Sequence, residues 1–462
     1  MVGNPRRASL GGVIRNNDGR FRRMHRNLLK SVFAVALLLL INGCTTFNAY
    51  NEKGSDIGEG NLELCKNTIA QRGEFAFNVV ERWYATKKDG LTIGIANIRN
   101  FAPKDESQVG LASSIEKNKR QILHAVDEFK KYDVNMIVFP EFCLTGYFWN
   151  TENNDPVGSK GLHGCWQYMN QGAVNAQMEW LSQLQSKLGD GLEYIIFNNI
   201  RRAQPSELAG PENRFLNSLY VIDRFFDCKN LYSEFNEENR IYDKTFLPGV
   251  EKTYEQSGID DFLVIDTEKW GRFGFTICYD LCFSQLFEEY GMWDKVDAII
   301  QTASWRGTGN RDAGKEDYKE MRGYHRKPVI NKYGYGYQWN LMAAARAATN
   351  QVWLIACNAV GNQEMKLTEP KEVYYEFWGG SGLWAPSGMN LLQASCNNGS
   401  LAAVPDELLV IHGIDIKGGV ASAKENYGDY YQDFRYYSDS TDPGIIEIYR
   451  PVDNDRAFSR MK

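Results

Sequence analysis

The feature that most constrains the fold of this chain is a regular alternation of short apolar runs with amphipathic stretches. Runs at 91–98 and 136–139 have the length and composition of buried strands. Between them, apolar residues recur with helical spacing up to Phe129, and Ser113 and Glu116 fit a capping box that opens this helix. This strand–helix–strand rhythm predicts an α/β domain in which helices cover the sheets.

The same alternation continues to about residue 417 and sets the domain boundaries. Further strands are expected at 194–197, 219–222, 262–265, 273–277, 298–301 and 352–356, with helices at 180–188 and 284–289. Because no repeat and no long polar linker interrupts it, we expect one domain over residues 91–417. Before it, residues 45–90 are expected to hold a spacer and a helix at about 61–85, and residues 418–462 a C-terminal extension.

Composition excludes several classes of protein. Of the 462 residues, 43% are hydrophobic and 13% aromatic, which is typical of a globular protein. The formal charge of -6 is small for this length, so we expect no nucleic-acid partner. The nine cysteines form neither CxxC pairs nor a dense framework, so no disulfide scaffold is predicted. No HExxH motif or zinc-type cysteine spacing is present, which gives no reason to expect a metal.

The N-terminus has the pattern of an export signal. Basic residues precede an apolar run at 31–41, which is too short to span a bilayer as a mature helix and ends in Asn42-Gly43-Cys44. This ending resembles the lipobox of bacterial lipoproteins, although Asn42 departs from the usual small residue. The resemblance implies that residues 1–44 are a leader, that Cys44 is lipidated, and that the protein is exported and anchored to a bacterial membrane by lipid. Met24 is a candidate true start, and an uncleaved N-terminal anchor is the alternative.

Three segments carry residues suited to chemistry. Glu141 follows an apolar run, where Pro140 ends sheet pairing and delivers the carboxylate at the carboxyl end of a strand. Lys244 lies within an apolar and aromatic segment, with Glu251 shortly after it. Cys278 ends a strand-like run before a predicted helix, at a turn that we expect to expose the sulfur. Taken alone, each residue also has a non-catalytic interpretation: a solvated glutamate, a surface lysine or a core cysteine.

Together these segments resemble the nitrilase, or carbon-nitrogen hydrolase, superfamily, in which a glutamate, a lysine and a cysteine occur in this order within similar local sequences. Further matching segments lie at 217–223, 302–305, 346–350, 358–361 and 380–382. The resemblance covers about residues 91–417 and implies an α-β-β-α sandwich that assembles into homo-oligomers. It implies no metal and no organic cofactor.

The resemblance also assigns roles. Glu141 would act as the base, Lys244 as a fixed cation and Cys278 as the nucleophile, while Glu251 would position the lysine. An unperturbed thiol with a pKa near 8.5 is only about 3% thiolate at pH 7, so the nucleophile needs such a base. The backbone N–H of Tyr279 would stabilise the oxyanion together with the lysine.

The identity of the substrate stays open in the sequence. True nitrilases commonly have Cys-Trp-Glu at the nucleophile, whereas Cys278-Tyr279-Asp280 is more similar to the amidase branches. We therefore expect an amidase that acts on a small-molecule amide. The alternatives are a nitrilase that acts on a nitrile and a lipid-anchored binding protein without catalytic activity. A papain-like site with His325 or His412 as base lacks that family's motif context.

Candidate pocket residues are Tyr147, Ser304 and Trp305. The segment 306–337 holds eight Lys or Arg against four Asp or Glu, together with five tyrosines. We expect this segment to cover the pocket and to select the substrate, with a solvated polar loop as the alternative.

Overall fold

A computed structural model describes residues 65–83, 89–101, 108–147, 179–203, 215–228, 240–249, 251–253, 255–258, 262–307, 328–366, 372–396 and 404–432. All of them belong to one compact unit, Glu63–Lys462. The expected leader, Cys44, His325 and most of segment 306–337 lie outside the described residues.

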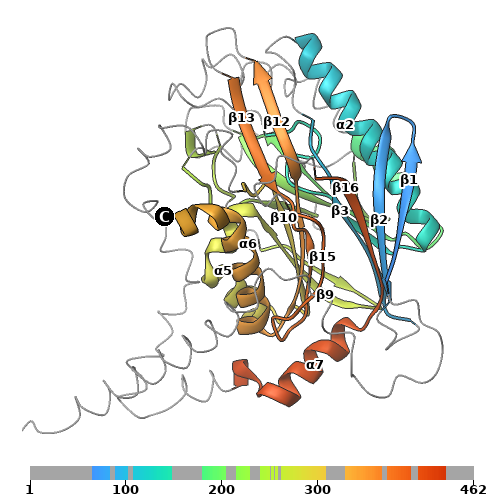
Figure 1. Cartoon of the computed structure of the whole chain (residues 1–462). Coiled ribbons are helices and arrows are strands. Elements are labelled where there is room, and N and C mark those ends of the chain that lie inside the picture. Colours follow the sequence, from blue (N-terminus) through green and yellow to red (C-terminus); the bar gives the residue numbers. More distant parts are fainter. Residues whose placement is uncertain are drawn as a thin grey trace, which may run out of the picture. The chain divides into compact units, whose positions relative to one another are not determined.

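The larger sheet has eight strands, which run in space in the order β1-β2-β16-β3-β4-β5-β6-β7 (Figure 1). Their bounds are β1 (Cys65–Arg72), β2 (Phe75–Trp83), β16 (Asp406–Ile414), β3 (Leu91–Asn97), β4 (Met136–Val138), β5 (Tyr194–Arg202), β6 (Phe215–Ile222) and β7 (Ile241–Asp243). Strands β3, β4 and β5 are parallel neighbours, and β5, β6 and β7 continue the sheet in antiparallel order.

The second sheet has six strands in the order β15-β14-β11-β10-β9-β8. Their bounds are β15 (Asn390–Gln393), β14 (Gly382–Trp384), β11 (Trp353–Asn358), β10 (Ala298–Ala303), β9 (Gly271–Ile277) and β8 (Val264–Thr267). The central strands β9, β10 and β11 are parallel, and their carboxyl ends therefore meet at one edge. A separate antiparallel hairpin is formed by β12 (Val360–Lys366) and β13 (Glu372–Trp378).

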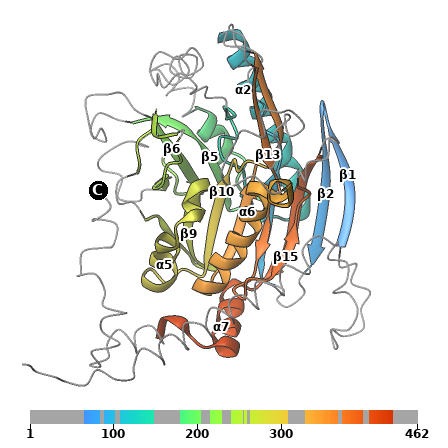
Figure 2. The ribbon, with the colours of Figure 1, turned by 60° about the vertical axis from the view of Figure 1, so that its left-hand side comes forward.

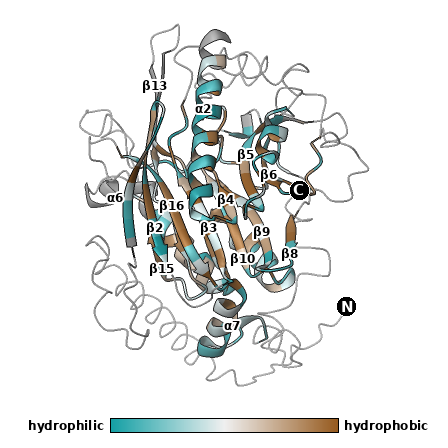
Figure 3. Ribbon diagram, turned by 90° about the vertical axis from the view of Figure 1, so that its right-hand side faces the viewer, coloured by the Kyte–Doolittle hydropathy of each residue, from teal (hydrophilic) through white to brown (hydrophobic). Residues whose placement is uncertain are grey.

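Helices cover the outer faces of both sheets. The described α-helices are α2 (Gln108–Phe129), α5 (Ser284–Glu288), α6 (Pro328–Asn350) and α7 (Ile416–Tyr427), and residues 179–185 are also helical. Short helical turns follow at η1 (Lys130–Tyr132), η3 (Glu251–Thr253), η4 (Cys278–Cys282) and the π-type η5 (Glu289–Trp293). Figure 2 shows α5 and α6 against β9 and β10, and Figure 3 shows α2 across β3, β4 and β16 with hydrophilic residues outward.

The side chains of one strand explain why four layers form. On β16, Leu409 and Ile411 join the core between the two sheets, while Leu408 and Val410 join the core beneath α2. A strand that is apolar on both faces must be covered on both, because successive side chains point to opposite sides. The expected α-β-β-α sandwich is thereby confirmed, as are the predicted strands within residues 91–356.

Two local predictions are wrong. The helix expected at 61–85 is instead the β1–β2 hairpin, in which Phe75, Phe77 and Val79 are buried with the period of a strand. Strand β2 pairs in parallel with β16, so tertiary pairing decides the conformation of this segment. The capping box is also misplaced, because α2 starts at Gln108 and Ser113 lies inside it.

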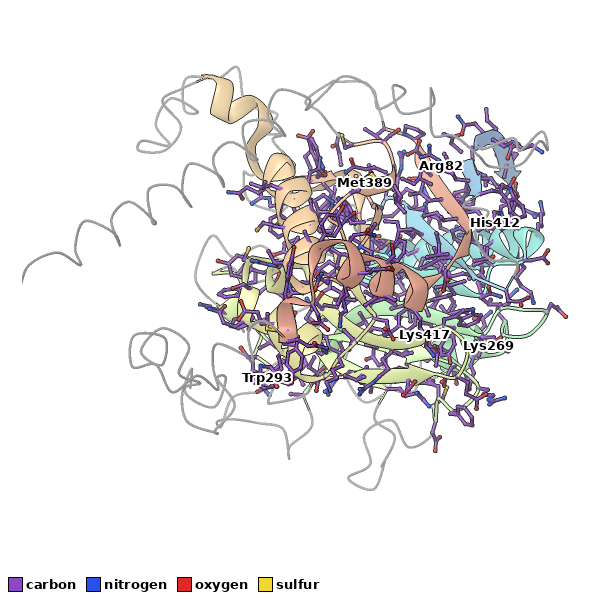
Figure 4. All side chains as sticks on the ribbon, turned by 90° about the horizontal axis from the view of Figure 1, so that it is seen from below. Arg82, Lys269, Trp293, Met389, His412 and Lys417 are labelled. Carbon is purple, nitrogen blue, oxygen red and sulfur yellow. The ribbon has the colours of Figure 1, made fainter. Side chains whose placement is uncertain are left out.

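The beginning of the expected C-terminal extension packs on the domain. In α7, Ile416, Val420 and Ala423 are buried, and the indole N–H of Trp353 donates to the Ile416 carbonyl at 2.9 Å. Figure 4, which views this end of the molecule, shows α7 with Lys417 labelled. The domain therefore continues past residue 417, through α7 to Tyr427.

Candidate active site

Glu141 lies at the carboxyl end of β4, as predicted, in a turn that ties the two sheets together. Its backbone N–H donates to the Ala303 carbonyl at 3.2 Å, at the end of β10 in the other sheet. Its carbonyl oxygen accepts from the Asn100 amide at 2.7 Å and from the Ser304 hydroxyl at 2.8 Å. The glutamate backbone is therefore held from both sheets, and its side chain is fully buried.

Three donors fix the Glu141 carboxylate. Oε1 accepts from Asn217 Nδ2 at 2.7 Å and from Lys244 Nζ at 2.9 Å, and Oε2 accepts from the backbone N–H of Ser304 at 2.7 Å. A carboxylate with this many donors is held in one orientation, which a general base requires. Ser304, expected in the pocket, thus contacts the candidate base.

Lys244 follows β7 and is bound between two carboxylates. Its Nζ contacts Glu141 Oε1 at 2.9 Å and Glu251 Oε2 at 2.6 Å, and its side chain is fully buried. Burial alone would lower the lysine pKa, but the two carboxylates outweigh it and raise the pKa well above the ordinary value. Lys244 therefore stays a cation at neutral pH.

Glu251 lies in η3 and has a second donor beyond the lysine. The Tyr147 hydroxyl donates to Glu251 Oε1 at 3.2 Å, and the tyrosine ring packs edge-on against Phe142 and Phe377 at 5.3 Å and 6.1 Å between centroids. The structure thus places Tyr147 in contact with the carboxylate that holds the lysine, whereas the sequence placed it in the pocket. Burial raises the pKa of Glu251, and Lys244 opposes this.

Cys278 begins η4 at the end of β9, with a left-handed backbone φ of 45°. Such a conformation is costly for a side-chain-bearing residue and recurs at functional sites. Gln301 Nε2 donates to the Cys278 carbonyl at 3.1 Å and supports the turn.

The turn buries the cysteine rather than exposing its sulfur, so this expectation is wrong: Cys278 is 8% exposed. Burial and the Glu141 carboxylate raise the pKa of its thiol well above the ordinary value, although Lys244 opposes them. At neutral pH the thiol is therefore protonated, and attack by the sulfur requires that a base remove the proton.

Asp280 joins the lysine segment to the cysteine turn, and sequence reasoning missed this role. Oδ2 accepts from the Tyr242 hydroxyl at 2.8 Å and from the Ile277 N–H at 2.9 Å, and Oδ1 accepts from the Phe246 N–H at 2.8 Å. Burial raises the pKa of this carboxyl to about 7, against these donors. The residue was visible in Cys278-Tyr279-Asp280, but its partners become evident only in three dimensions.

The remaining predicted residues surround this centre. Tyr279 is half-buried and packs edge-on against Phe283 at 5.4 Å between centroids. The backbone N–H of Trp305 donates to Asn358 Oδ1 at 2.7 Å, and the buried Trp305 ring lies 5.9 Å from the ring of Trp339 between centroids.

His412, the described candidate for a papain-like base, is engaged elsewhere. Its Nε2 is 2.9 Å from Glu81 Oε1, and its ring stacks on Trp83 at 3.8 Å; Figure 4 labels it beside the N-terminal hairpin.

Within the described ranges no cluster of His, Cys, Asp or Glu is arranged to hold a metal ion. The six cysteines whose side chains are described form no disulfide. None of the described helices combines the length and apolar character needed to cross a membrane.

Comparison with solved structures gives low-identity matches. An amidase of the nitrilase superfamily from Nesterenkonia is 15% identical, with a TM-score of 0.44 over 73% of this chain and 97% of the other. A carbon-nitrogen hydrolase from Helicobacter pylori is 15% identical, with a TM-score of 0.47 over 73% and 92%. For the glutamine-dependent NAD+ synthetase of Acinetobacter baumannii the values are 17% and 0.44, and the match covers 70% of this chain but only 45% of that one.

No curated protein matches the chain in sequence. The family comparison is more informative, because the carbon-nitrogen hydrolase model matches residues 106–408. This region is more than half of the chain and includes the buried glutamate, lysine and cysteine. The chain therefore belongs to the carbon-nitrogen hydrolase family.

Proposed function

We propose that the protein is an amidase that hydrolyses a small-molecule amide through a thioester on Cys278. The observation that carries this proposal is the buried Glu141–Lys244–Glu251 chain of ion pairs, because all three of these side chains act electrostatically on the thiol of Cys278. A site of this kind provides a base, a fixed cation and a nucleophile without a cofactor.

The proposed first step is acylation. Glu141 takes the thiol proton of Cys278 as the sulfur bonds to the amide carbon, and the electron pair of the carbonyl moves to its oxygen. Lys244 and the Tyr279 N–H stabilise that oxyanion; losing one such donor costs roughly 100- to 1000-fold in rate. The oxyanion then collapses, the C–N bond breaks, and Glu141 gives its proton to the leaving nitrogen.

The second step is hydrolysis of the thioester. Glu141 takes a proton from water as the water oxygen bonds to the acyl carbon. The C–S bond breaks and the proton returns to sulfur, which leaves a carboxylic acid and restores the enzyme. Because Glu141, Lys244 and Cys278 interact closely, they are expected to titrate as one coupled unit.

An amide is favoured over a nitrile because Asp280 follows Tyr279 where true nitrilases commonly have Glu after Trp. The non-catalytic alternative is disfavoured, since a binding protein has no use for a buried base held by three donors beside a strained cysteine.

The test is ammonia release from a panel of amides and matching nitriles, measured for wild type and Cys278→Ala. Amide turnover that disappears in the variant supports the proposal. Turnover that persists in folded Cys278→Ala refutes the mechanism, and turnover of nitriles alone refutes the amide assignment. The absence of any turnover, with no acylation of Cys278 detected by mass spectrometry, supports a binding protein instead.

We further propose that Cys44 is lipidated, that the enzyme works outside the cytoplasm on a bacterial membrane, and that it forms homo-oligomers. The basic and apolar leader before Cys44 and the membership of the family support these proposals. Cys44→Ser is expected to move the protein from the membrane fraction, and sedimentation analysis measures the oligomeric state. If the variant stays in the membrane fraction, the leader acts as an uncleaved anchor.

A further inference from the structure

A fourth carboxyl residue, Glu255, lies beside the buried ion pairs. Its backbone N–H donates to the Glu251 carbonyl at 2.8 Å, one turn earlier. The backbone of Glu255 also forms an isolated β-bridge with Phe215 at the start of β6, the strand that carries Asn217. The residue is 1% exposed, so its side chain is withdrawn from water together with that of Glu251.

The side chains of Glu255 and Glu251 interact in this buried turn, and each carboxyl group shifts the pKa of the other. Two ionised carboxylates have only acceptors, so a hydrogen bond between these groups requires that one of the two carries a proton. Glu251 is the acceptor, because Lys244 and Tyr147 already donate to its oxygens. A carboxylate has room for about four donors, so Glu251 accommodates Glu255 as well.

The charges around Lys244 lead to the same arrangement. Glu141, Glu251 and Glu255 all act electrostatically on the one ammonium group. Three ionised carboxyls would leave the buried group with an excess of two negative charges, which a dry interior disfavours strongly. Burial, followed by repulsion from Glu251, raises the pKa of Glu255 well above its ordinary value.

We propose that Glu255 is a positioning residue that keeps a proton at neutral pH and donates it to Glu251, thereby holding Glu251 against Lys244. Glu255 does not touch the reacting atoms. It limits the negative charge around the lysine, so that the ammonium group remains directed at Glu141 and the nucleophile.

The test compares Glu255→Gln with Glu255→Leu. The glutamine amide keeps a donor for Glu251 without a titrating group, whereas leucine has a similar volume and no donor. We expect Glu255→Gln to stay within about threefold of wild type in kcat and Glu255→Leu to fall roughly 10- to 100-fold, as expected for losing a hydrogen bond to a charged group. KM should change little, because the residue acts through the lysine. Circular dichroism and thermal unfolding show whether both variants fold.

The effect on turnover rests on the proposed function, but a second readout does not. At pH 8, where Asp280 is mostly ionised, the infrared difference between wild type and Glu255→Gln should contain the carbonyl band of a protonated carboxylic acid. Absence of that band overturns the proposal even in an active enzyme, and its presence supports the proposal even if no amide substrate is found. Wild-type turnover in a folded Glu255→Leu variant also overturns it, as does a folded Glu255→Gln variant as impaired as Glu255→Leu.

Discussion

Replacing Lys244 by Met removes a cation that is bound between two fully buried carboxylates. Removal of one partner of a buried ion pair costs about 3–5 kcal/mol, because the remaining charge stays desolvated. Here two carboxylates, Glu141 and Glu251, lose the same cation, so we expect the loss in the free energy of unfolding to lie at or above the upper end of that range near pH 8.

A matched control exists on the surface. Lys269 Nζ is 2.5 Å from Glu193 Oε1, closer than in either buried contact, but the two side chains are 63% and 40% exposed. Exposed pairs contribute about 0–1 kcal/mol, so Lys269→Met should barely change stability. Urea unfolding of wild type and both variants at equal protein concentration measures the difference.

The penalty should also depend on pH. Burial raises the pKa of Glu251 even with the lysine present, and loss of Lys244, which lowers that pKa, must raise it further. A carboxyl whose folded pKa exceeds its unfolded value binds more protons in the folded state, so stability falls as pH rises between the two values. The cost of Lys244→Met should therefore be smaller at pH 5.5 than at pH 8. A cost equal to that of Lys269→Met, or independent of pH, would refute this reasoning.

Three further predictions concern the site and the sheet. Asp280 has a pKa of about 7, and its protonation weakens its hold on the cysteine turn, so kcat/KM should fall as pH drops through 7; Asp280→Asn should lower activity at pH 8 and lose this limb of the profile. Asn217→Ala removes a hydrogen-bond donor to the Glu141 carboxylate and should lower kcat roughly 10- to 100-fold. The control is Asn199→Ala on the neighbouring strand, where the side chain accepts from Thr145 instead; a folded variant should keep kcat within about threefold of wild type. Phe77→Ala, in the buried face of the hairpin, should cost about 3–5 kcal/mol in urea unfolding, and Ile69→Ala, 81% exposed, under about 0.5; equal costs would contradict the strand pairing.

Much of the fold could be predicted because the central strands are apolar on both faces. Such runs are recognisable without knowledge of their neighbours, as at 91–98 and 273–277. The N-terminal hairpin was missed for the opposite reason. Only one face of β2 has a regular apolar pattern, and its conformation is decided by pairing with β16, more than 300 residues later in the chain.

The residues of the candidate site also differ in whether the sequence could predict them. Glu141, Lys244 and Cys278 could be identified because each ends or follows a strand within a local sequence that resembles a known family. Asp280 and Glu255 could not, because an aspartate or glutamate acquires such a role only through the groups folded around it. Nothing in the local sequence shows that Tyr242 donates to Asp280, or that Glu255 lies against Glu251.

The backbone of Glu141 has a consequence for how activity arises during folding. Its N–H is bound to Ala303 and its side chain to the Ser304 N–H, so the base acquires its orientation only when the two sheets have docked. Before docking, the cysteine is an ordinary thiol with no fixed proton acceptor. Hydrolytic turnover is therefore expected only after the two sheets have docked, and a chain with only one sheet formed would lack hydrolytic activity.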